Sequence, residues 1–299
     1  MIETNRIGIV ILNYQSYKDT IKLLKNLYEI NKQLENLELI TCVVDNASPD
    51  ESVTIIKKEL EDLYSQEPFF LLPLENNAGY STGNNAGIKF LLEKDCQYIF
   101  IMNNDIEIND SNFFPDMLTS IINSKAAIVG PGVIQKGKLE LPLKRKRPSF
   151  TGIILENFLL PIKILSNKRK RQNLKKKKEI QNVYSVSGCC FLFDTQQALK
   201  DGKLFDDRLF LYEEETILGE RMYNNGLLVM FNPTTSVIHI HGATITKHYD
   251  KKKQDKIKDQ SFRIYLDDYR LDFNNIQKSI IMFSRNIRWK YEQIIANLK

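Results

Sequence analysis

Three polar residues end an apolar run in the middle of the chain. After Ile-Phe-Ile-Met at 99–102 come Asn103, Asn104 and Asp105. A carboxylate at the end of a buried strand is costly unless a partner satisfies it. One interpretation is a strand that leaves the core through an Asn/Asp turn. The other is a site where oxygen ligands hold a divalent cation and a phosphate. These residues alone leave both interpretations open.

Two further segments carry groups suited to acid–base or metal chemistry. Glu213, Glu214 and Glu215 open a predicted helix, where the helix dipole favours acidic residues. Three carboxylates in a row also repel one another, which raises a pKa and suits a general base. His239 and His241 are two residues apart on a predicted strand and therefore share a face. Either a metal or phosphate contact or a structural role fits this pair.

A glycine- and asparagine-rich segment spans residues 76–88. Its glycines are Gly79, Gly83 and Gly87, and its asparagines include Asn77, Asn84 and Asn85. The spacing differs from the dinucleotide-binding fingerprint. Glycines in the first turns of a helix cost stability and are expected where a ligand or another backbone approaches closely. The pattern therefore favours a ligand site over a flexible loop.

Asp45 ends another predicted strand, in the sequence Val-Val-Asp-Asn-Ala-Ser. Ser48 or Asp50 can cap the helix that follows, but capping leaves Asp45 unexplained. Its carboxylate stands where it could accept hydrogen bonds from a ligand.

The elements that must position these residues alternate regularly in the first half of the chain. Apolar, β-branched runs occur at 7–12, 40–44, 69–72 and 98–102, with helical patterns near 17–34, 50–63 and 84–93. This alternation predicts an α/β fold with a mostly parallel central sheet flanked by helices. Ligands of such sheets bind at the carboxyl ends of the strands, so the polar strand ends are expected to form one site.

The second half is less regular. A strand is predicted at 182–194, a helix within 204–226 and short strands at 229–242, and an amphipathic helical region follows. We expect a main domain at 1–248, with a basic amphipathic insertion at 136–180, and a C-terminal helical appendage at 249–299.

Composition narrows the class of protein. The 299 residues are 42% hydrophobic with few Gly and Pro, which excludes a disordered or fibrous chain. The four cysteines show no metal-binding spacing, so buried free thiols are expected. The start of the chain lacks the features of a signal peptide, and no apolar run is long enough to span a bilayer. These features predict a cytoplasmic protein.

Taken together, these segments resemble the family 2 glycosyltransferases, especially the bacterial rhamnosyltransferase-like branch that makes capsular and other surface polysaccharides. The resemblance covers roughly residues 5–245. Its motifs, in order, are Asn13-Tyr14, Val-Val-Asp45, Asn77-x-Gly79 through Gly87, Asn103-x-Asp105, Ser187-Gly188-Cys189-Cys190, Phe205-Asp206, the glutamate-rich helix start and His239-x-x-Gly242. Two positions depart from the family pattern, because Asn103 replaces the first acid of Asp-x-Asp and Ile217 replaces an acid of the helix motif.

The resemblance implies a GT-A fold, a UDP- or dTDP-sugar donor, a divalent cation (Mn²⁺ or Mg²⁺) and inversion at the anomeric carbon. Asp105 would bind the cation, with His239 or, less favourably, His241. Glu215 best matches the general base, and Glu214 is second. Donor contacts would come from Asn13, Tyr14, Asp45, Asn77, Gly79, Asn84, Asn103 and Asn104, with Asp45 accepting from the pyrimidine or its ribose.

The basic character of the chain is concentrated in one segment. Residues 136–178 hold fifteen Lys/Arg against two acids, and an apolar stretch at 151–165 lies among the basic clusters. Such a segment suits an anionic membrane surface. No stacking aromatics are interleaved with the charges, which argues against nucleic acid. We therefore expect a peripheral protein at the inner face of the cell membrane, acting on a saccharide acceptor linked to polyprenyl diphosphate.

Two other functions remain as alternatives. One is a nucleotidyltransferase on a related α/β fold, although the first strand lacks the basic Gly-rich loop that usually follows it. The other is a non-catalytic relative that binds nucleotide sugars, which the departures at Asn103 and Ile217 keep open.

Overall fold

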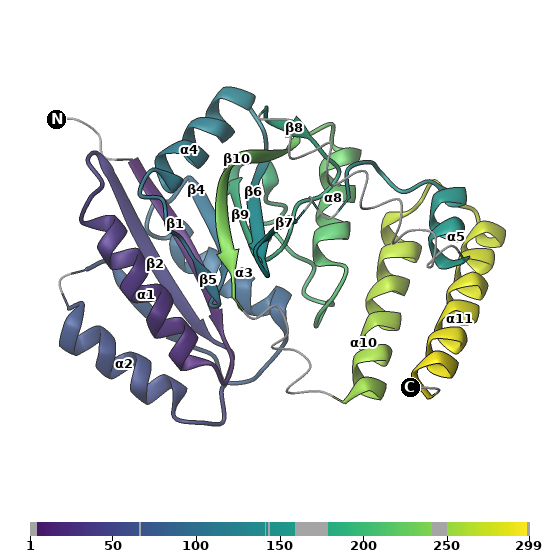
Figure 1. Ribbon diagram of the computed structural model, residues 1–299, viewed down its shortest axis with the longest axis horizontal. Helices are drawn as coiled ribbons and strands as arrows, with labels where there is room; N and C mark the ends of the chain where they lie inside the picture. Colours follow the sequence, from purple (N-terminus) through teal and green to yellow (C-terminus); the bar gives the residue numbers. More distant parts are fainter. Residues whose placement is uncertain are drawn as a thin grey trace.

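The computed structural model describes residues 5–65, 67–140, 142, 144–158, 179–240 and 250–297. Within this part of the chain the strands form one ten-stranded sheet with helices on both faces (Figure 1). The strands are β1 (Asn5–Asn13), β2 (Leu37–Asp45), β3 (Phe69–Pro73), β4 (Tyr98–Asn103), β5 (Ile106–Glu107), β6 (Ile128–Gln135), β7 (Lys138–Glu140), β8 (Gln181–Asn182), β9 (Cys190–Asp194) and β10 (Val229–His239). The helices are α1 (Tyr17–Asn31), α2 (Ser52–Leu63), α3 (Tyr80–Leu92), α4 (Phe113–Ser124), α5 (Phe150–Phe158), α7 (Thr195–Ala198), α8 (Glu214–Asn224), α10 (Lys251–Ile264), the π-helix η1 (Tyr265–Tyr269) and α11 (Asn275–Asn297).

The first half of the sheet brings the polar strand ends to one edge. β1 lies between β2 and β4, and all three strands are parallel. Their register places Asn13 opposite Asp45 and Leu12 opposite Asn103. The apolar runs thus end level with one another, which confirms the predicted strands and the common edge of their ends.

The second half makes the sheet mixed. Along the order β3-β2-β1-β4-β9-β6-β10-β5, four of the seven pairings are parallel, and β9 runs antiparallel to both of its neighbours. The strand predicted at 182–194 is two strands, β8 and β9, separated by a loop. The short strands predicted at 229–242 are one strand, β10, with an irregularity between Asn232 and Ser236. His241 and Gly242 lie outside the described residues.

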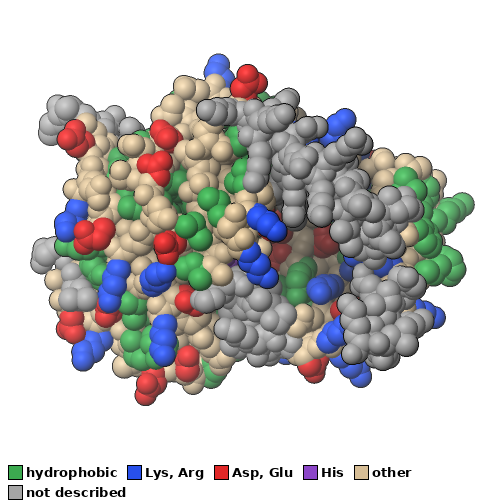
Figure 2. Space-filling model, viewed as in Figure 1, with side chains coloured by type: hydrophobic (Ala, Val, Ile, Leu, Met, Phe, Trp, Pro, Cys, Tyr) green, Lys and Arg blue, Asp and Glu red, His purple; other side chains and the backbone are tan. Residues whose placement is uncertain are grey.

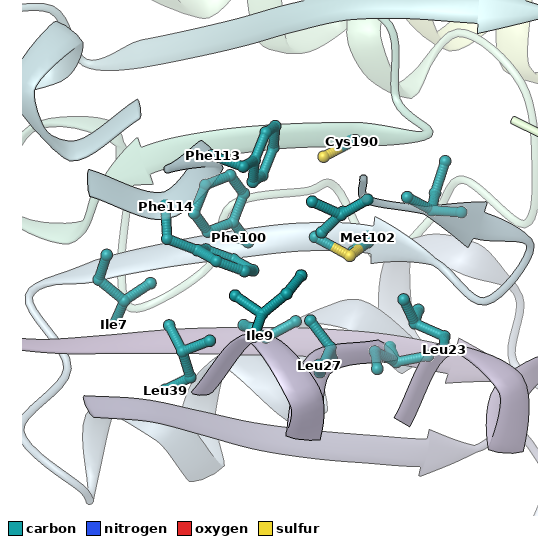
Figure 3. Packing of buried hydrophobic residues seen from close by; sticks show 14 of the residues in the cluster. Ile7, Ile9, Leu23, Leu27, Leu39, Phe100, Met102, Phe113, Phe114 and Cys190 are labelled. Atoms are coloured by element: carbon teal, nitrogen blue, oxygen red, sulfur yellow. The ribbon is translucent and has the colours of Figure 1, made fainter. Parts of the chain in front are cut away.

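Apolar side chains fill both faces of the sheet. On one face α1 and α4 pack over β1, β2 and β4, with Leu23, Leu27, Phe113 and Phe114 among the buried residues (Figure 3). On the other face α3 covers Val10 of β1 and Val44 of β2, and the same buried cluster extends to Leu218 and Met222 of α8. This two-sided burial explains why the central strands are apolar at nearly every position. The four cysteines are buried and free, as expected.

A third core joins the C-terminal helices to the rest of the protein. Ile153 of α5, Ile217 of α8, Phe262 of α10 and Ile281 of α11 are buried in one cluster. In Figure 1 the helices α5, α10 and α11 form a group beside α8, away from β1 and β2. The helical region predicted after residue 249 is therefore present. Its buried side chains form one cluster with Leu209 and Ile217 of the main sheet domain.

Candidate functional site

A cavity of about 1310 Å³ lies between the carboxyl ends of the parallel strands and the C-terminal helices. Nine predicted site residues line it: Tyr14, Asn77, Gly79, Asn103, Asn104, Asp105, Glu214, Glu215 and His239. Asn13, Asp45 and Asn84 are not among the lining residues. The structure therefore gathers most of the sequence-predicted site in a single cavity.

Asp45 and Asn13 are both fully buried and hold each other. Asn13 Nδ2 donates to Asp45 Oδ2 at 2.7 Å, and the Ser48 backbone N–H donates to Asp45 Oδ1 at 2.8 Å. Asp45 thereby fixes the turn after β2. Its predicted contact with the base or ribose of a donor stays a prediction, because this conformation uses both carboxylate oxygens inside the protein.

Asn46 is a lining residue that the sequence analysis did not select. Its Nδ2 donates to Asn77 Oδ1 at 2.9 Å and to the Gly79 carbonyl at 3.1 Å, while its buried Oδ1 has no hydrogen-bond partner among the described residues. A buried acceptor without a partner is costly, so this oxygen is suited to receive a donor group from a ligand. Asn46 directly follows Asp45 at the end of β2, and this strand-end position could have identified it as a site residue from the sequence.

Helix α3 begins at Tyr80, four residues before the predicted start, and it begins against another segment. Gly79 has φ +96°, and an added Cβ would collide with the backbone of Phe210. The Tyr80 N–H donates to the Phe210 carbonyl at 2.8 Å. Gly79 is thus required by close backbone approach. Asn84 lies inside this helix, 1% exposed, with Nδ2 donating to the Tyr80 carbonyl at 2.9 Å.

Asp105 and His239 come together from β10 and the turn between β4 and β5. His239 Nε2 lies 3.1 Å from Asp105 Oδ1, and Asp105 is only 4% exposed. The neighbouring Asn104 is directed elsewhere, because its Nδ2 donates to Ser16 Oγ at 2.6 Å and to Thr20 Oγ1 at 3.0 Å on α1. Asn104 therefore ties the end of β4 to the first turn of α1, while Asp105 and His239 face each other in the cavity.

A strained turn aims the two glutamates of α8. Tyr212 and Glu213 are consecutive residues with positive φ, at +73° and +66°. Such backbone is costly for residues other than glycine and is concentrated at functional sites. It places Glu214 and Glu215 in the first turn of α8, where both line the cavity.

The two glutamates have different environments. Glu215 Oε1 accepts the Gly188 backbone N–H at 3.0 Å, and Tyr80 donates its hydroxyl to the Gly188 carbonyl at 2.9 Å. Glu214 is 4% exposed, and its Oε1 has no partner among the described residues. Burial and the neighbouring Glu215 raise the pKa of Glu214 well above its ordinary value. Burial also raises the pKa of Glu215, but the Gly188 N–H and Lys144 act in the opposite direction. Glu215 is therefore the better placed proton acceptor.

Residues 144–147 are the first basic cluster of the segment 136–178 that was expected at a membrane surface, and two of its cations face the protein. Lys144 lines the cavity, with Nζ 3.4 Å from Thr216 Oγ1. Arg147 pairs with the fully buried Glu220 at 2.5 Å and with Asp272 at 2.9 Å. Glu220 also accepts the Tyr184 hydroxyl at 2.6 Å. These cations have structural partners, which sequence spacing alone did not reveal. The second basic cluster, 168–178, lies outside the described residues.

The wall opposite the strand ends is rich in cations. It is formed by α10, α11 and the residue before α10, and its charged lining residues are Lys252, Lys253, Lys256, Lys258, Arg285 and Arg288 with Asp250, Asp255 and Asp259. The strand-end side contributes Asp105 and the glutamates of α8. The cavity thus has an acidic wall and a basic wall. The sequence indicated amphipathic helices here but gave no sign that they face the strand ends.

Comparison with known proteins gives one family and several related proteins. The family model described as glycosyl transferase family 2 matches residues 8–198. A curated relative, the low-salt glycan biosynthesis hexosyltransferase Agl10 of Haloferax volcanii, is 24% identical over 283 residues, which are 94% of this chain and 78% of the relative.

Solved structures resemble the whole arrangement. The fragment 1–349 of S. aureus TarS in complex with UDP-GlcNAc has a TM-score of 0.58 at 15% identity, and the match covers 95% of this chain and 72% of that fragment. GalNAc-T7 with UDP, GalNAc and Mn²⁺ has a TM-score of 0.56 at 15% identity over 80% of this chain, which spans only 44% of that protein. The mannosyltransferase PcManGT of Pyrobaculum calidifontis, with GDP-Man and Mn²⁺, has a TM-score of 0.53 at 13% identity, and this chain spans 58% of its length. These likenesses confirm the predicted GT-A fold.

Proposed function

The chain belongs to glycosyl transferase family 2, and we propose that it is an inverting enzyme that moves a sugar from a nucleotide-sugar donor to a saccharide acceptor. The observation that carries the proposal is the Glu215 carboxylate, held by the Gly188 N–H in the cavity that also contains Asp105 and His239. A base and a metal-competent pair in one cavity are the two parts that this reaction requires.

The donor would bind at the strand ends. Asp105 and His239 offer one carboxylate and one imidazole, and the described residues contain no group of three or more potential metal ligands. This pair fits Mn²⁺ or Mg²⁺ shared with a diphosphate, because such ions take the rest of their shell from phosphate and water. The bound ion would stabilise the charge of the departing nucleoside diphosphate. Asn46, Asn77 and Tyr14 line the same side and supply hydrogen-bonding groups for the nucleotide.

We assign the proton transfer to Glu215 in this proposal. Glu215 takes the proton of the acceptor hydroxyl as the hydroxyl oxygen forms its bond to the anomeric carbon. The bond from that carbon to the diphosphate oxygen breaks, and its electron pair leaves with the nucleoside diphosphate. Attack from the face opposite the leaving group inverts the anomeric centre. The Gly188 N–H stabilises the charged form of Glu215 before the reaction and orients it.

The basic wall supports an acceptor that carries negative charge. Six Lys/Arg and three Asp of α10, α11 and the residue before α10 line it. A saccharide linked to polyprenyl diphosphate has such a charge next to its sugar. We propose this acceptor class, and a hexose as the transferred sugar because the curated relative is named a hexosyltransferase. A dTDP- or UDP-linked rhamnose is the other candidate, from the branch that the sequence resembles.

Calorimetry with a nucleoside diphosphate tests the donor site. We expect Mn²⁺ to increase the affinity of the wild type, and Asp105→Ala to abolish that increase. Asp62→Ala, an exposed acid on α2, serves as the control and should bind as the wild type does. Metal-dependent affinity that survives in Asp105→Ala would remove Asp105 from the site.

A second measurement separates an enzyme from a non-catalytic binding protein. Nucleotide sugars are screened for thermal stabilisation, and the donors that stabilise the protein are incubated with Mn²⁺ without acceptor. Slow release of the nucleoside diphosphate, absent in Glu215→Gln, supports catalysis. A protein that binds a donor tightly but never releases the diphosphate, with or without acceptor saccharides, would favour the non-catalytic alternative.

A further inference from the structure

Six large apolar side chains form an exposed ridge on α5 and α11. They are Leu155, Phe158, Ile276, Ile280, Phe283 and Ile287, and each is between 39% and 72% exposed. Figure 2 shows hydrophobic side chains gathered at the edge of the molecule where α5 and α11 lie. We call this set the apolar ridge. Single exposed apolar residues are ordinary, but a contiguous group of this size marks an interaction surface.

The apolar residues of the ridge on α11 occupy one continuous side of the helix. Ile276, Ile280, Phe283 and Ile287 follow one another at helical spacing and therefore share one side of the helix. Another side of α11 is satisfied inside the protein, because Ile281 is fully buried and Ser284 Oγ accepts Asn157 Nδ2 of α5 at 2.8 Å. The helix is thus apolar on both sides, and only one of them has a protein partner among the described residues.

We propose that the apolar ridge is a membrane-docking surface for bilayers that contain anionic lipid. An apolar face bordered by basic residues binds at the boundary between headgroups and acyl chains. Lys290 is exposed and lies seven residues after Phe283, on the ridge side of α11. In the sequence, the twenty residues that follow Phe158, 159–178, carry nine Lys/Arg and no acid. Each such residue near the surface strengthens the attraction to anionic lipid.

Charge also argues against a second copy of the chain as the occupant. Two copies joined through their ridges would bring the exposed Lys290 of each copy to one interface. Like charges at an interface oppose association, whereas an anionic bilayer attracts them. No helix among the described residues is long and apolar enough to cross a membrane. The proposed contact is one at the bilayer surface.

The position of the ridge deepens the proposed function, on which this consequence rests. The same helix α11 contributes Arg285, Arg288 and Trp289 to the lining of the cavity. A bilayer seated on the ridge would therefore lie along the helix that forms the basic wall, where a polyprenyl diphosphate could present its sugar without leaving the membrane.

Co-sedimentation with vesicles tests the proposal. The probes are phosphatidylcholine vesicles with and without phosphatidylglycerol, and the variant is Ile276→Glu with Phe283→Glu. We expect its partition onto anionic vesicles to fall by about tenfold or more. The two large apolar side chains that would transfer from water into the bilayer are replaced by charged ones. The matched control is Ile122→Glu on α4, where the native side chain is 49% exposed but lies outside the ridge. This control should bind vesicles as the wild type does.

Three results decide the outcome. Equal sedimentation of wild type and double variant, across a salt series, would overturn the proposal. A wild type that is dimeric by ultracentrifugation without lipid, and that the double variant makes monomeric without changing vesicle binding, would also overturn it and assign the ridge to a subunit interface. Loss of vesicle binding in the double variant, with Mn²⁺-dependent nucleoside diphosphate affinity intact, supports it. Because donor affinity is measured separately, a protein that docks on vesicles but binds no donor would contradict only the proposed function.

Discussion

The backbone N–H of Gly188 donates to Oε1 of Glu215 at a distance of 3.0 Å. The Tyr80 hydroxyl donates to the carbonyl of the same glycine and holds its loop in place. The carboxylate is thus oriented by a group that has no side chain. An added Cβ on Gly188 would meet the same oxygen at less than a contact distance. Orientation of Glu215, the proposed base, therefore depends on the absence of a methyl group at position 188.

Gly188→Ala is expected to lower kcat by about 10²-fold, the scale expected for displacement of a catalytic group by about 1 Å. The KM for the donor should change little, because the residues at the strand ends are untouched. Steady-state kinetics measures both values. Gly152→Ala on α5 is the control, because its Cβ would meet only the hydroxyl of Ser149, the residue before the helix. A rise in donor KM with kcat preserved would mean that the loop binds the donor and does not position the base.

Glu215→Gln is expected to reduce transfer by about 10²–10⁴-fold, the range for removal of a general base. Donor affinity should remain close to that of the wild type. Glu214→Gln should have the smaller effect, because the raised pKa of Glu214 already favours its neutral form. Single-turnover rates of the two variants compare them directly. If Glu214→Gln is the more damaging change, the base is Glu214.

The pH dependence of transfer follows from the raised pKa of Glu215. A base works in its deprotonated form, so kcat/KM should fall as pH decreases through a pKa above the ordinary glutamate value of 4.5. Since Glu214 and Glu215 interact, the midpoint belongs to the pair. The acidic limb of the profile should be lost in Glu215→Gln. A limb that persists unchanged in this variant would assign the titration to another group.

The raised pKa of Glu214 should make the folded protein less stable as pH rises, whereas transfer activity should increase with pH. Its pKa is raised in the folded protein, so between the ordinary value and the folded value the folded state binds more protons than the unfolded state. The free energy of unfolding should therefore decrease as pH rises from about 4.5 through the folded pKa. Thermal denaturation across this range should give a flatter curve for Glu214→Gln than for the wild type. Parallel curves would show that Glu214 ionises in the folded state as freely as in the unfolded state.

Arg147 should matter for stability. Arg147→Gln removes a cation from the fully buried Glu220, which then keeps Tyr184 and the more distant Arg270 as its partners among the described residues. We expect a loss of about 3 kcal/mol in the free energy of unfolding, the lower end of the range for a broken buried pair, because Arg270 remains near Glu220. Arg145→Gln is the matched control in the same basic cluster, because Arg145 only contacts Gln181 at the surface. Denaturant unfolding of both variants is the measurement, and equal midpoints would contradict the prediction.

The parts of the fold that local pattern determines were predictable from the sequence. The four apolar runs became β1 to β4, and the rule that ligands bind at strand ends selected Asp105, Asn77 and Gly79 correctly as residues of one cavity. The amphipathic pattern after residue 249 likewise predicted the C-terminal helices.

The parts that depend on contacts between distant segments were not predictable. β9 pairs antiparallel between β4 and β6, a choice that no local pattern encodes. The start of α3 at Tyr80 is set by the backbone of Phe210, 130 residues away in sequence. The basic cluster at 144–147 has the composition of a membrane contact, yet Arg147 turns inward because Glu220 is buried nearby. In each case the partner, and not the residue itself, decides the structure.

The core shared by α8 and the C-terminal helices has a consequence for how the chain tolerates shortening. A chain that stopped before α10 would uncover Leu209 and Ile217, which are buried against Phe262 and its neighbours. It would also leave Glu220 without Arg270. Helix α8 carries Glu215 at one end and Glu220 further along. Proteolysis or a frameshift near residue 250 should therefore displace Glu215, the proposed base, and remove the basic wall. Helix α8 and the C-terminal helices should unfold together in one cooperative transition.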